Sequence, residues 1–160
     1  MKIIDVLGKI IEFDCMGCDI STHKIIPPGG YAYEDDFINI SADPIIPIPG
    51  FMVLGINKHV KSMNQLTKDE RYRIIDILNL TIEKIKECNI SNEVLLIQEE
   101  NSSHFHIWIV PIHEWMSKFD NKVENIDGII KYAKEIYNEE TKIEILNCVE
   151  LLKKSFKTNK

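Results

Sequence analysis

Two histidines in the segment SHFHIWIVP, which runs from Ser103 to Pro111, have the type and spacing that suit chemistry on a strand. Successive side chains of a strand point to opposite faces, so His104, His106 and Trp108 share one face and the apolar residues between them share the other. Each residue advances a strand by about 3.3 Å, which places the two imidazoles about 7 Å apart. Packing does not require such a pair, although a half-exposed strand with incidental polar residues shows the same alternation.

Cys15 and Cys18 form a C-x-x-C pair near the start of the chain. This spacing fits zinc ligands, a redox pair or ordinary buried thiols. A structural zinc site needs four tetrahedral nitrogen or sulfur ligands, so the pair would need two partners from elsewhere. A redox pair is disfavoured because no thioredoxin-like β-α-β pattern surrounds the cysteines.

The elements that must position these residues begin with a long helix from Thr67 to Cys88. Thr67 and Glu70 form the S/T-x-x-E capping pattern, in which the two side chains bond to early backbone N–H groups. Apolar residues then recur at helical spacing and predict one buried stripe, made of Ile74, Ile75, Leu78, Ile82 and Ile85.

Strand-like runs precede and follow this helix, over residues 31–33, 37–40, 51–56, 94–98 and 104–110. Strands on both sides of one inserted helix predict an α+β fold with an antiparallel sheet of about five strands. Two helices, predicted over residues 126–137 and 141–156, end the chain. We expect a single domain over residues 1–160, with a core near 15–115 and a helical C-terminal appendage near 116–160.

Composition narrows the class of protein. The chain has 160 residues, of which 44% are hydrophobic and 28% charged, as in an ordinary folded protein. The formal net charge of −6 argues against duplex nucleic acid or an anionic membrane as the main partner. Asp5, Lys9 and Glu12 interrupt the apolar N-terminal segment, so we expect no secretory signal and a cytoplasmic location. The four cysteines are then not a disulfide framework.

Several ordered motifs resemble those of the histidine triad (HIT) superfamily of nucleotide hydrolases and transferases. HFHIWIVP resembles the superfamily signature HxHxHxxP. The superfamily's other motifs are matched, in order, by CMGC at residues 15–18, AYEDD at residues 32–36, Asp43 before PIIPIPG, and GFMVLGINKHV at residues 50–60. The resemblance covers residues 15–111 and implies a HIT-like fold.

Three departures from the superfamily pattern concern the substrate. Trp108 replaces the third histidine, as glutamine does in the galactose-1-phosphate uridylyltransferase branch. Trp108 either donates its indole N–H to a phosphate oxygen or only fills space beneath the pocket. The Gly-Gln-Ser/Thr approach to the triad is absent, which leaves Asn101, Ser102 and Ser103 as substitutes. Gly17 replaces an aromatic residue that lines the superfamily's base pocket.

The resemblance implies a role for each matched residue. His106 corresponds to the nucleophile that attacks an α-phosphate and forms a nucleotidyl-histidine, a role that needs an acceptor such as a backbone carbonyl at its other ring nitrogen. Trp108 would assist it, and Asn101 and Ser103 would bind the nucleotide. Asp43 corresponds to the carboxylate that accepts from ribose hydroxyls, although an aspartate before a proline is also an ordinary turn residue.

The resemblance also implies a structural zinc ion. Cys15, Cys18, His59 and His104 match the ligands of zinc-bearing members, while His23 and His113 are rival ligands.

We therefore expect a homodimeric nucleotide phosphohydrolase or nucleotidyltransferase that acts on a nucleotide or nucleotide conjugate through His106. The alternative is a zinc-stabilised nucleotide-binding protein without turnover, which the change to Trp108 favours.

Overall fold

The computed structural model describes residues 1–158, and its main sheet has five antiparallel strands within that range. The strands are β3 (Tyr31–Glu34), β4 (Ile38–Ala42), β5 (Met52–Ile56), β6 (Val94–Ile97) and β7 (His106–Pro111), in the spatial order β3-β4-β5-β7-β6. The predicted α+β class and the number of strands are confirmed. The histidine strand β7 lies between β5 and β6, one place in from the edge of the sheet.

The long helix α2 (Lys68–Glu87) joins β5 to β6 and begins at the predicted capping box, with Thr67 as its N-cap. Its buried stripe differs from the prediction, because Ile75 is 51% exposed whereas Thr81 and Lys84 are buried. The residues that reach the core follow the spacing 74, 78, 81 and 85, which leaves Ile75 at the flank of the contact face.

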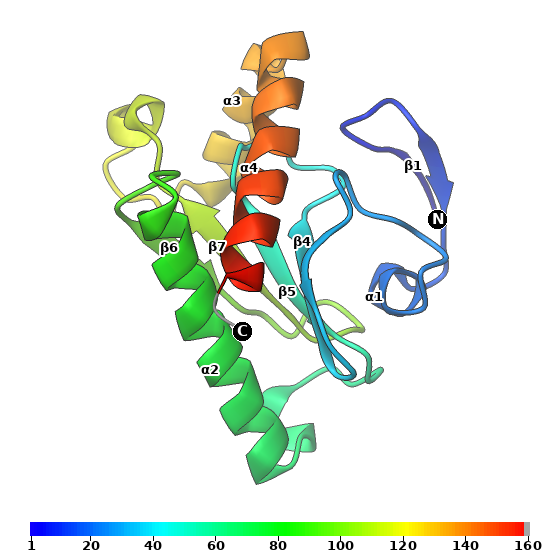
Figure 1. Cartoon of the computed structure of the whole chain (residues 1–160). Coiled ribbons are helices and arrows are strands. Elements are labelled where there is room, and N and C mark those ends of the chain that lie inside the picture. The colour runs from blue at the N-terminus through cyan, green and yellow to red at the C-terminus, as the bar shows by residue number, and fades with distance from the viewer. Residues whose placement is uncertain (159–160) are drawn as a thin grey trace.

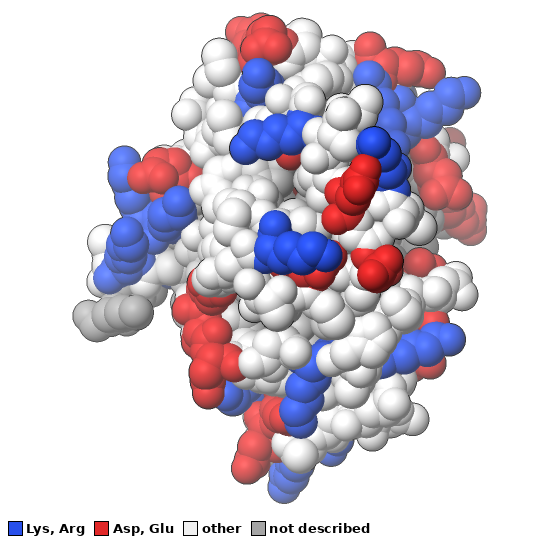
Figure 2. Space-filling view, turned by 90° about the vertical axis from the view of Figure 1, so that its right-hand side faces the viewer, with Lys and Arg blue, Asp and Glu red and all other residues white. Residues whose placement is uncertain are grey.

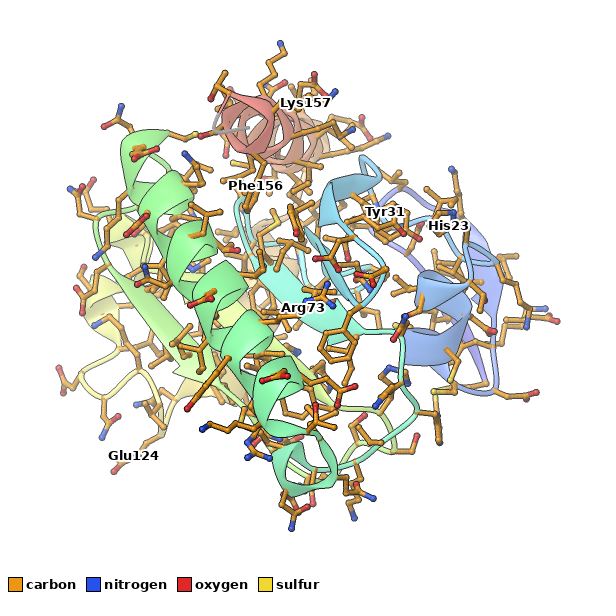
Figure 3. All side chains as sticks on the ribbon, turned by 60° about the horizontal axis from the view of Figure 1, so that its bottom comes forward. His23, Tyr31, Arg73, Glu124, Phe156 and Lys157 are labelled. Atoms are coloured by element: carbon orange, nitrogen blue, oxygen red, sulfur yellow. The ribbon has the colours of Figure 1, made fainter. Side chains whose placement is uncertain are left out.

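The main core lies between the sheet and two helices, α2 and the C-terminal α4 (Glu139–Lys157), which cover the same face of the sheet (Figure 1). Phe156 of α4 points toward the sheet and lies 5.2 Å from the ring of Tyr33, measured between centroids (Figure 3). The part of α4 that enters this core consists of Ile145, Val149, Leu152 and Phe156. The C-terminal helix is thus part of the main core, although the sequence indicates only an appendage packed on the sheet.

A second apolar cluster covers part of the opposite face. Residues of α3 (Ile126–Ile136) and of the 3-10 helix Glu114–Lys118 pack there against Phe51 and Val110. Val110, at the end of the histidine face of β7, is therefore buried. Trp108 packs against this cluster, whereas His106 is not part of it and faces a different neighbour.

That neighbour is the N-terminal part of the chain, whose elements the sequence did not predict. A two-stranded hairpin, β1 (Lys2–Ile4) and β2 (Ile10–Glu12), is followed by the short helix α1 (Met16–Ser21), and both lie to one side of the main sheet (Figure 1). The hairpin is tied to the rest by the backbone of Val6, which donates to Pro44 O and accepts from the Tyr137 hydroxyl.

On the face of the molecule that carries this hairpin, basic and acidic side chains are interspersed, and neither sign forms a continuous patch (Figure 2). None of the helices in the described part of the chain is both long enough and apolar enough to cross a membrane.

Candidate functional site

Four potential metal ligands meet where α1 approaches the main sheet. Cys15 immediately precedes α1 and Cys18 lies within it, while His59 follows β5 and His104 precedes β7. One nitrogen or sulfur atom from each residue lies within 4.8 Å of the other three. The structure therefore brings together all four of the ligands that the resemblance implied.

The distances in this cluster fit a tetrahedral metal ion. Nδ1 of His59 lies 3.5 Å from Cys15 Sγ and 3.1 Å from Cys18 Sγ, and Nδ1 of His104 lies 3.5 Å from each sulfur. Zinc bonds of about 2.3 Å to sulfur and 2.0–2.1 Å to nitrogen place such atoms about 3.5 Å apart in a tetrahedron. All four positions would be filled by protein atoms, which is the pattern of a structural site.

His104 is oriented for this role by its second ring nitrogen. Its Nε2 donates to Ile56 O at 2.7 Å, so in the neutral ring the lone pair is on Nδ1, toward the thiols. Burial lowers the pKa of His104, which favours the neutral form that binds a metal. Burial and the neighbouring Cys15 raise the pKa of Cys18 to about 11, and a bound cation would reverse this effect by stabilising the thiolate.

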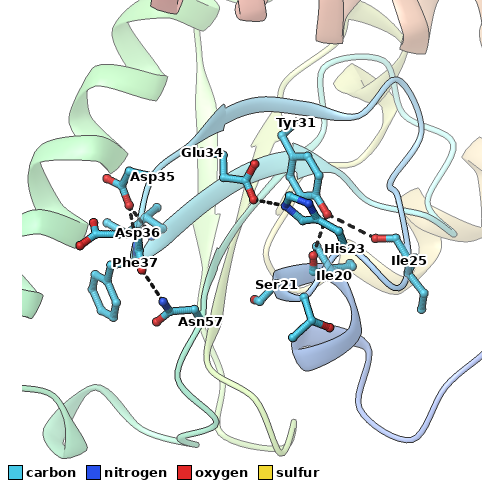
Figure 4. A network of polar contacts seen from close by, with 12 residues as sticks. Ile20, Ser21, His23, Ile25, Tyr31, Glu34, Asp35, Asp36, Phe37 and Asn57 are labelled. Carbon is cyan, nitrogen blue, oxygen red and sulfur yellow. Dashed lines mark hydrogen bonds and ion pairs between the residues drawn. The ribbon is translucent and has the colours of Figure 1, made fainter.

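The two rival histidines are held elsewhere. His23 pairs with Glu34 and packs beside Tyr31, at 5.0 Å between ring centroids (Figure 4). His113 donates from Nε2 to Pro49 O at 2.7 Å. Neither is in the four-residue cluster, so the structure favours His59 and His104 as partners of the cysteines.

Gly17 has a packing role, which gives a physical reason for a glycine at the position where the resembled motif has an aromatic residue. A Cβ at this position would lie 2.4–2.8 Å from atoms of the His104 ring. Any larger side chain would force α1 away from His104, and this would pull Cys15 and Cys18 away from the histidines. The glycine is required for the close approach of α1 to the metal ligands.

His106 follows this cluster on β7, and its side chain is half-buried. Its Nδ1 lies 3.0 Å from His104 O, a backbone carbonyl of the kind that the nucleophile role requires. A carbonyl only accepts, so Nδ1 carries the proton and Nε2 of the neutral ring carries the free lone pair.

A cavity of about 370 Å³ lies above His106, within the range typical of small-molecule sites. Its floor is formed by β4, β5 and β7, and its walls come from α1 and from Phe13, which follows the N-terminal hairpin. Trp108 also lines it. The indole packs edge-on against Phe51, at 5.5 Å between ring centroids, and its centroid lies 6.2 Å from that of His106. Among residues 1–158 the indole N–H bonds to no other group, and it is accessible to solvent.

Asp43 lines the same cavity while it also makes a turn. Its Oδ1 accepts from the backbone nitrogens of Ile45 at 2.7 Å and Ile46 at 2.9 Å, so the turn role is real. Its other carboxylate oxygen is used in neither bond. Burial raises the pKa of Asp43, although both turn bonds and the nearby His106 oppose this shift.

Only some of the polar residues in the loop before β7 line the cavity. Ser102 and Ser103 line the cavity, whereas Asn101 is exposed, donates to Glu99 Oε2 at 3.1 Å and is not part of the lining. Ser102 donates from Oγ to His104 O at 3.1 Å and accepts from His104 N at 3.3 Å. Of the two residues predicted to bind nucleotide here, only Ser103 reaches the cavity.

The sequence prediction missed two polar residues in the cavity floor. Asn39 and Ser41 of β4 alternate with the core residues Ile38 and Ile40, and both are almost fully buried against the cavity. Their signal was the polar period of two within an apolar strand, which is also the pattern of a strand with one face in solvent.

The sequence matches no family model and no curated protein, whereas the structure matches solved HIT proteins. A Hit-like protein involved in cell-cycle regulation from Bartonella henselae superposes with a TM-score of 0.63 at 13% identity, covering 89% of this chain and 96% of that chain. A HIT family protein from Bacillus anthracis superposes with a TM-score of 0.57 at 16% identity, covering 80% of this chain and 100% of that chain. A hypothetical histidine triad nucleotide-binding protein from Sulfolobus tokodaii superposes with a TM-score of 0.57 at 17% identity, covering 87% of this chain and 94% of that chain. This chain therefore has the HIT fold.

Proposed function

We propose that this protein is a nucleotide phosphohydrolase or nucleotidyltransferase that acts at an α-phosphate through a nucleotidyl-histidine on His106. The observation that carries the proposal is the hydrogen bond from His106 Nδ1 to His104 O, 3.0 Å long. This bond keeps the proton on Nδ1 and leaves the lone pair of Nε2 free, directed away from the backbone carbonyl. His106 itself lines the cavity. The HIT fold supports the proposal at the level of fold.

The reaction has two displacements at phosphorus. In the first, Nε2 attacks in line, an N–P bond forms, and the bond from phosphorus to the leaving group breaks with its electron pair. The imidazole becomes positively charged, and the carbonyl of His104 stabilises that charge through Nδ1–H. In the second, water or an acceptor phosphate attacks phosphorus and the N–P bond breaks, with its electron pair returning to Nε2 to restore the neutral ring. When water attacks, its proton is released to the solvent.

Trp108 sets a limit on the leaving group. Its indole N–H can donate to a phosphate oxygen, but it has no acceptor site and cannot carry a proton to the departing atom. Leaving groups that are stable as anions, such as a phosphate or polyphosphate, therefore suit the site. Asp43 would hold the ribose hydroxyls through its second carboxylate oxygen, and Ser103 would contact the phosphate.

We propose zinc as the metal of the four-residue cluster. Two thiols and two imidazoles at tetrahedral distances are a donor set that zinc prefers. With four protein ligands the ion would have a structural role: it would hold α1 against the start of β7 and so shape one wall of the cavity.

The test is direct detection of the intermediate. The protein is mixed with diadenosine tetraphosphate, quenched at neutral pH and analysed by intact-mass spectrometry for an added adenylyl group that is lost in acid. We expect the adduct in the native chain, none in His106→Ala, and full retention in the matched variant His113→Ala, whose histidine lies outside the cavity. An adduct that persists in His106→Ala would overturn the mechanism.

The alternative is a zinc-stabilised nucleotide-binding protein without turnover, and the absence of a proton-carrying side chain at Trp108 favours it. Tight nucleotide binding with neither adduct nor product, across dinucleoside polyphosphates, nucleoside phosphoramidates and adenylated compounds, would establish this alternative. We further propose a cytoplasmic homodimer, for which light scattering of the purified chain gives the mass.

A further inference from the structure

Asn39 and Ser41 form a polar pair that the fold itself does not use. Asn39 is 5% exposed and Ser41 is 2% exposed, and both line the cavity. Among residues 1–158, neither side chain has a hydrogen-bond partner, and the polar atoms of both remain accessible to solvent. Because both residues line the cavity, their donors and acceptors are free to bond to a ligand that enters it.

The sheet register connects this pair to the nucleophile. Asn39 pairs with Gly55 of β5, and Gly55 pairs with His106 of β7, so the three residues form one row across the sheet. Ser41, Val53 and Trp108 form the next row. A ligand bound at His106 therefore lies over the same floor as the amide of Asn39.

Gly55 leaves the space between the side chains of Asn39 and His106 unfilled. A Cβ on Gly55 would lie 3.1 Å from Oδ1 and 3.3 Å from Nδ2 of Asn39, which is tighter than nine in ten real contacts of a Cβ. The residue has no positive φ that would itself call for glycine. Its missing side chain leaves the amide edge of Asn39 accessible from the side of His106.

The rest of the cavity determines which chemical group suits this edge. Phe13, Met16 and Ile20 line the same space and are apolar. Apolar walls beside a planar amide, which offers one donor and one acceptor, fit a flat heterocycle with polar atoms at its rim. An asparagine amide can form two hydrogen bonds with the edge of a nucleobase, as it does with adenine in DNA recognition.

We infer that Asn39, assisted by Ser41, recognises the hydrogen-bonding edge of the nucleobase and is a specificity-determining residue of this site. The inference rests on the proposed function, because it assumes that the ligand is a nucleotide. Asp43, two residues further along the chain, would hold the ribose of the same ligand.

The test compares affinities for AMP, GMP, CMP and UMP with that for purine riboside 5′-monophosphate, whose base has no exocyclic donor or acceptor. By calorimetry we expect the best of the four to bind the native chain at least about tenfold more tightly than the bare purine. In Asn39→Leu, which keeps the size of the side chain, this preference should disappear. In Asn39→Asp, which offers only acceptors, the preference should shift toward GMP, whose N1–H and N2–H are adjacent donors.

Two controls separate this inference from the proposed function. The melting temperature should stay native in Asn39→Leu, because the side chain of Asn39 bonds to no other described residue, and adduct formation on His106 is measured in the native chain. If Asn39→Leu keeps the native preference while the native chain forms the adduct, the inference is overturned and the proposed function stands. If the native chain binds none of the five nucleotides, both are overturned.

Discussion

His104 and His106 are joined by a hydrogen bond from Nδ1 of His106 to the carbonyl of His104, 3.0 Å long. The ring of His104 meanwhile lies between Ile56 O and the thiols of Cys15 and Cys18. One residue thus contributes its side chain to the cluster of potential metal ligands and its backbone to the proposed nucleophile. Loss of the metal is expected to affect His106 through this residue.

Metal content provides the first prediction. The purified chain should contain about one zinc ion, and Cys15→Ser and His59→Ala should lose it, because a structural site needs its four ligands. Both variants should melt at a lower temperature, since metal binding contributes free energy to folding. Adduct formation on His106 should also slow by about tenfold or more, as when a group that orients a metal ligand is removed.

The matched control for this prediction is His106→Ala. It removes a histidine next to the cluster without removing a ligand, so metal content and melting temperature should stay native. Elemental analysis and differential scanning calorimetry of the four proteins give the answer. Full metal in both ligand variants would show that the assigned set is wrong.

Gly17 provides a prediction about packing. Gly17→Ala would place a methyl group 2.4–2.8 Å from atoms of the His104 ring, so the free energy of unfolding should fall by about 1–3 kcal/mol and zinc affinity should fall with it. Gly128→Ala in α3 is the matched control, because the added Cβ makes an ordinary contact at 3.4 Å and alanine favours a helix. Urea unfolding measures the free energy of unfolding of both variants. Equal stability of the two variants would contradict the close approach of α1.

Local signals explain which parts of the fold could be predicted. The helix α2 was predicted because its capping box and apolar stripe lie within the segment itself. The helix α1 has six residues, one of them glycine, and no side-chain cap, so its own sequence does not predict it. It is held by distant groups: the Tyr31 hydroxyl donates to Ile20 O at 2.6 Å (Figure 4). Ser21 donates to Ile56 O at 3.0 Å.

The prediction of the site was also limited to residues with a recognisable signal in their own segment of sequence. The four potential metal ligands and His106 were predicted from their resemblance to known motifs, whereas Asn39 and Ser41 matched none. A strand with alternating polar residues has one face in water unless something covers it. Here the cover is α1, which precedes β4 in the chain and was itself not predicted.

Asp35 provides a prediction about pH. Burial alone would raise its pKa, but bonds from the Tyr33 hydroxyl, from the backbone N–H groups of Ile38 and Phe37, and from Arg73 outweigh this and lower it. A carboxyl whose pKa is lowered in the folded state stabilises that state above its unfolded pKa, and this contribution is lost as pH falls through the folded value.

Asp35→Asn should therefore unfold more easily than the native chain at pH 7, by about 1 kcal/mol, and the difference should shrink below the ordinary carboxyl pKa of 3.8 and be lost as the pH falls through the lower pKa of folded Asp35. Asp36→Asn is the control, because the Asp36 side chain is 84% exposed and its carboxylate pairs only with Arg73 among the described residues. Its effect should be small at both pH values. A penalty for Asp35→Asn that is the same at pH 3 and pH 7 would show that the charge of Asp35 contributes nothing.

Trp108 provides the last prediction, which concerns the leaving group. An indole cannot deliver a proton, so substrates that release a phosphate or polyphosphate should react faster than phosphoramidates that release an alkylamine, by about a hundredfold or more. Trp108→His should narrow that gap, because histidine can protonate the amine as it departs. Trp115→His, which makes the same exchange outside the cavity, should leave the ratio unchanged. The ratio of kcat/KM for diadenosine tetraphosphate and an adenosine 5′-alkylphosphoramidate measures the effect. A native chain that prefers the phosphoramidate would show that a proton reaches the leaving group by a route that does not involve residue 108.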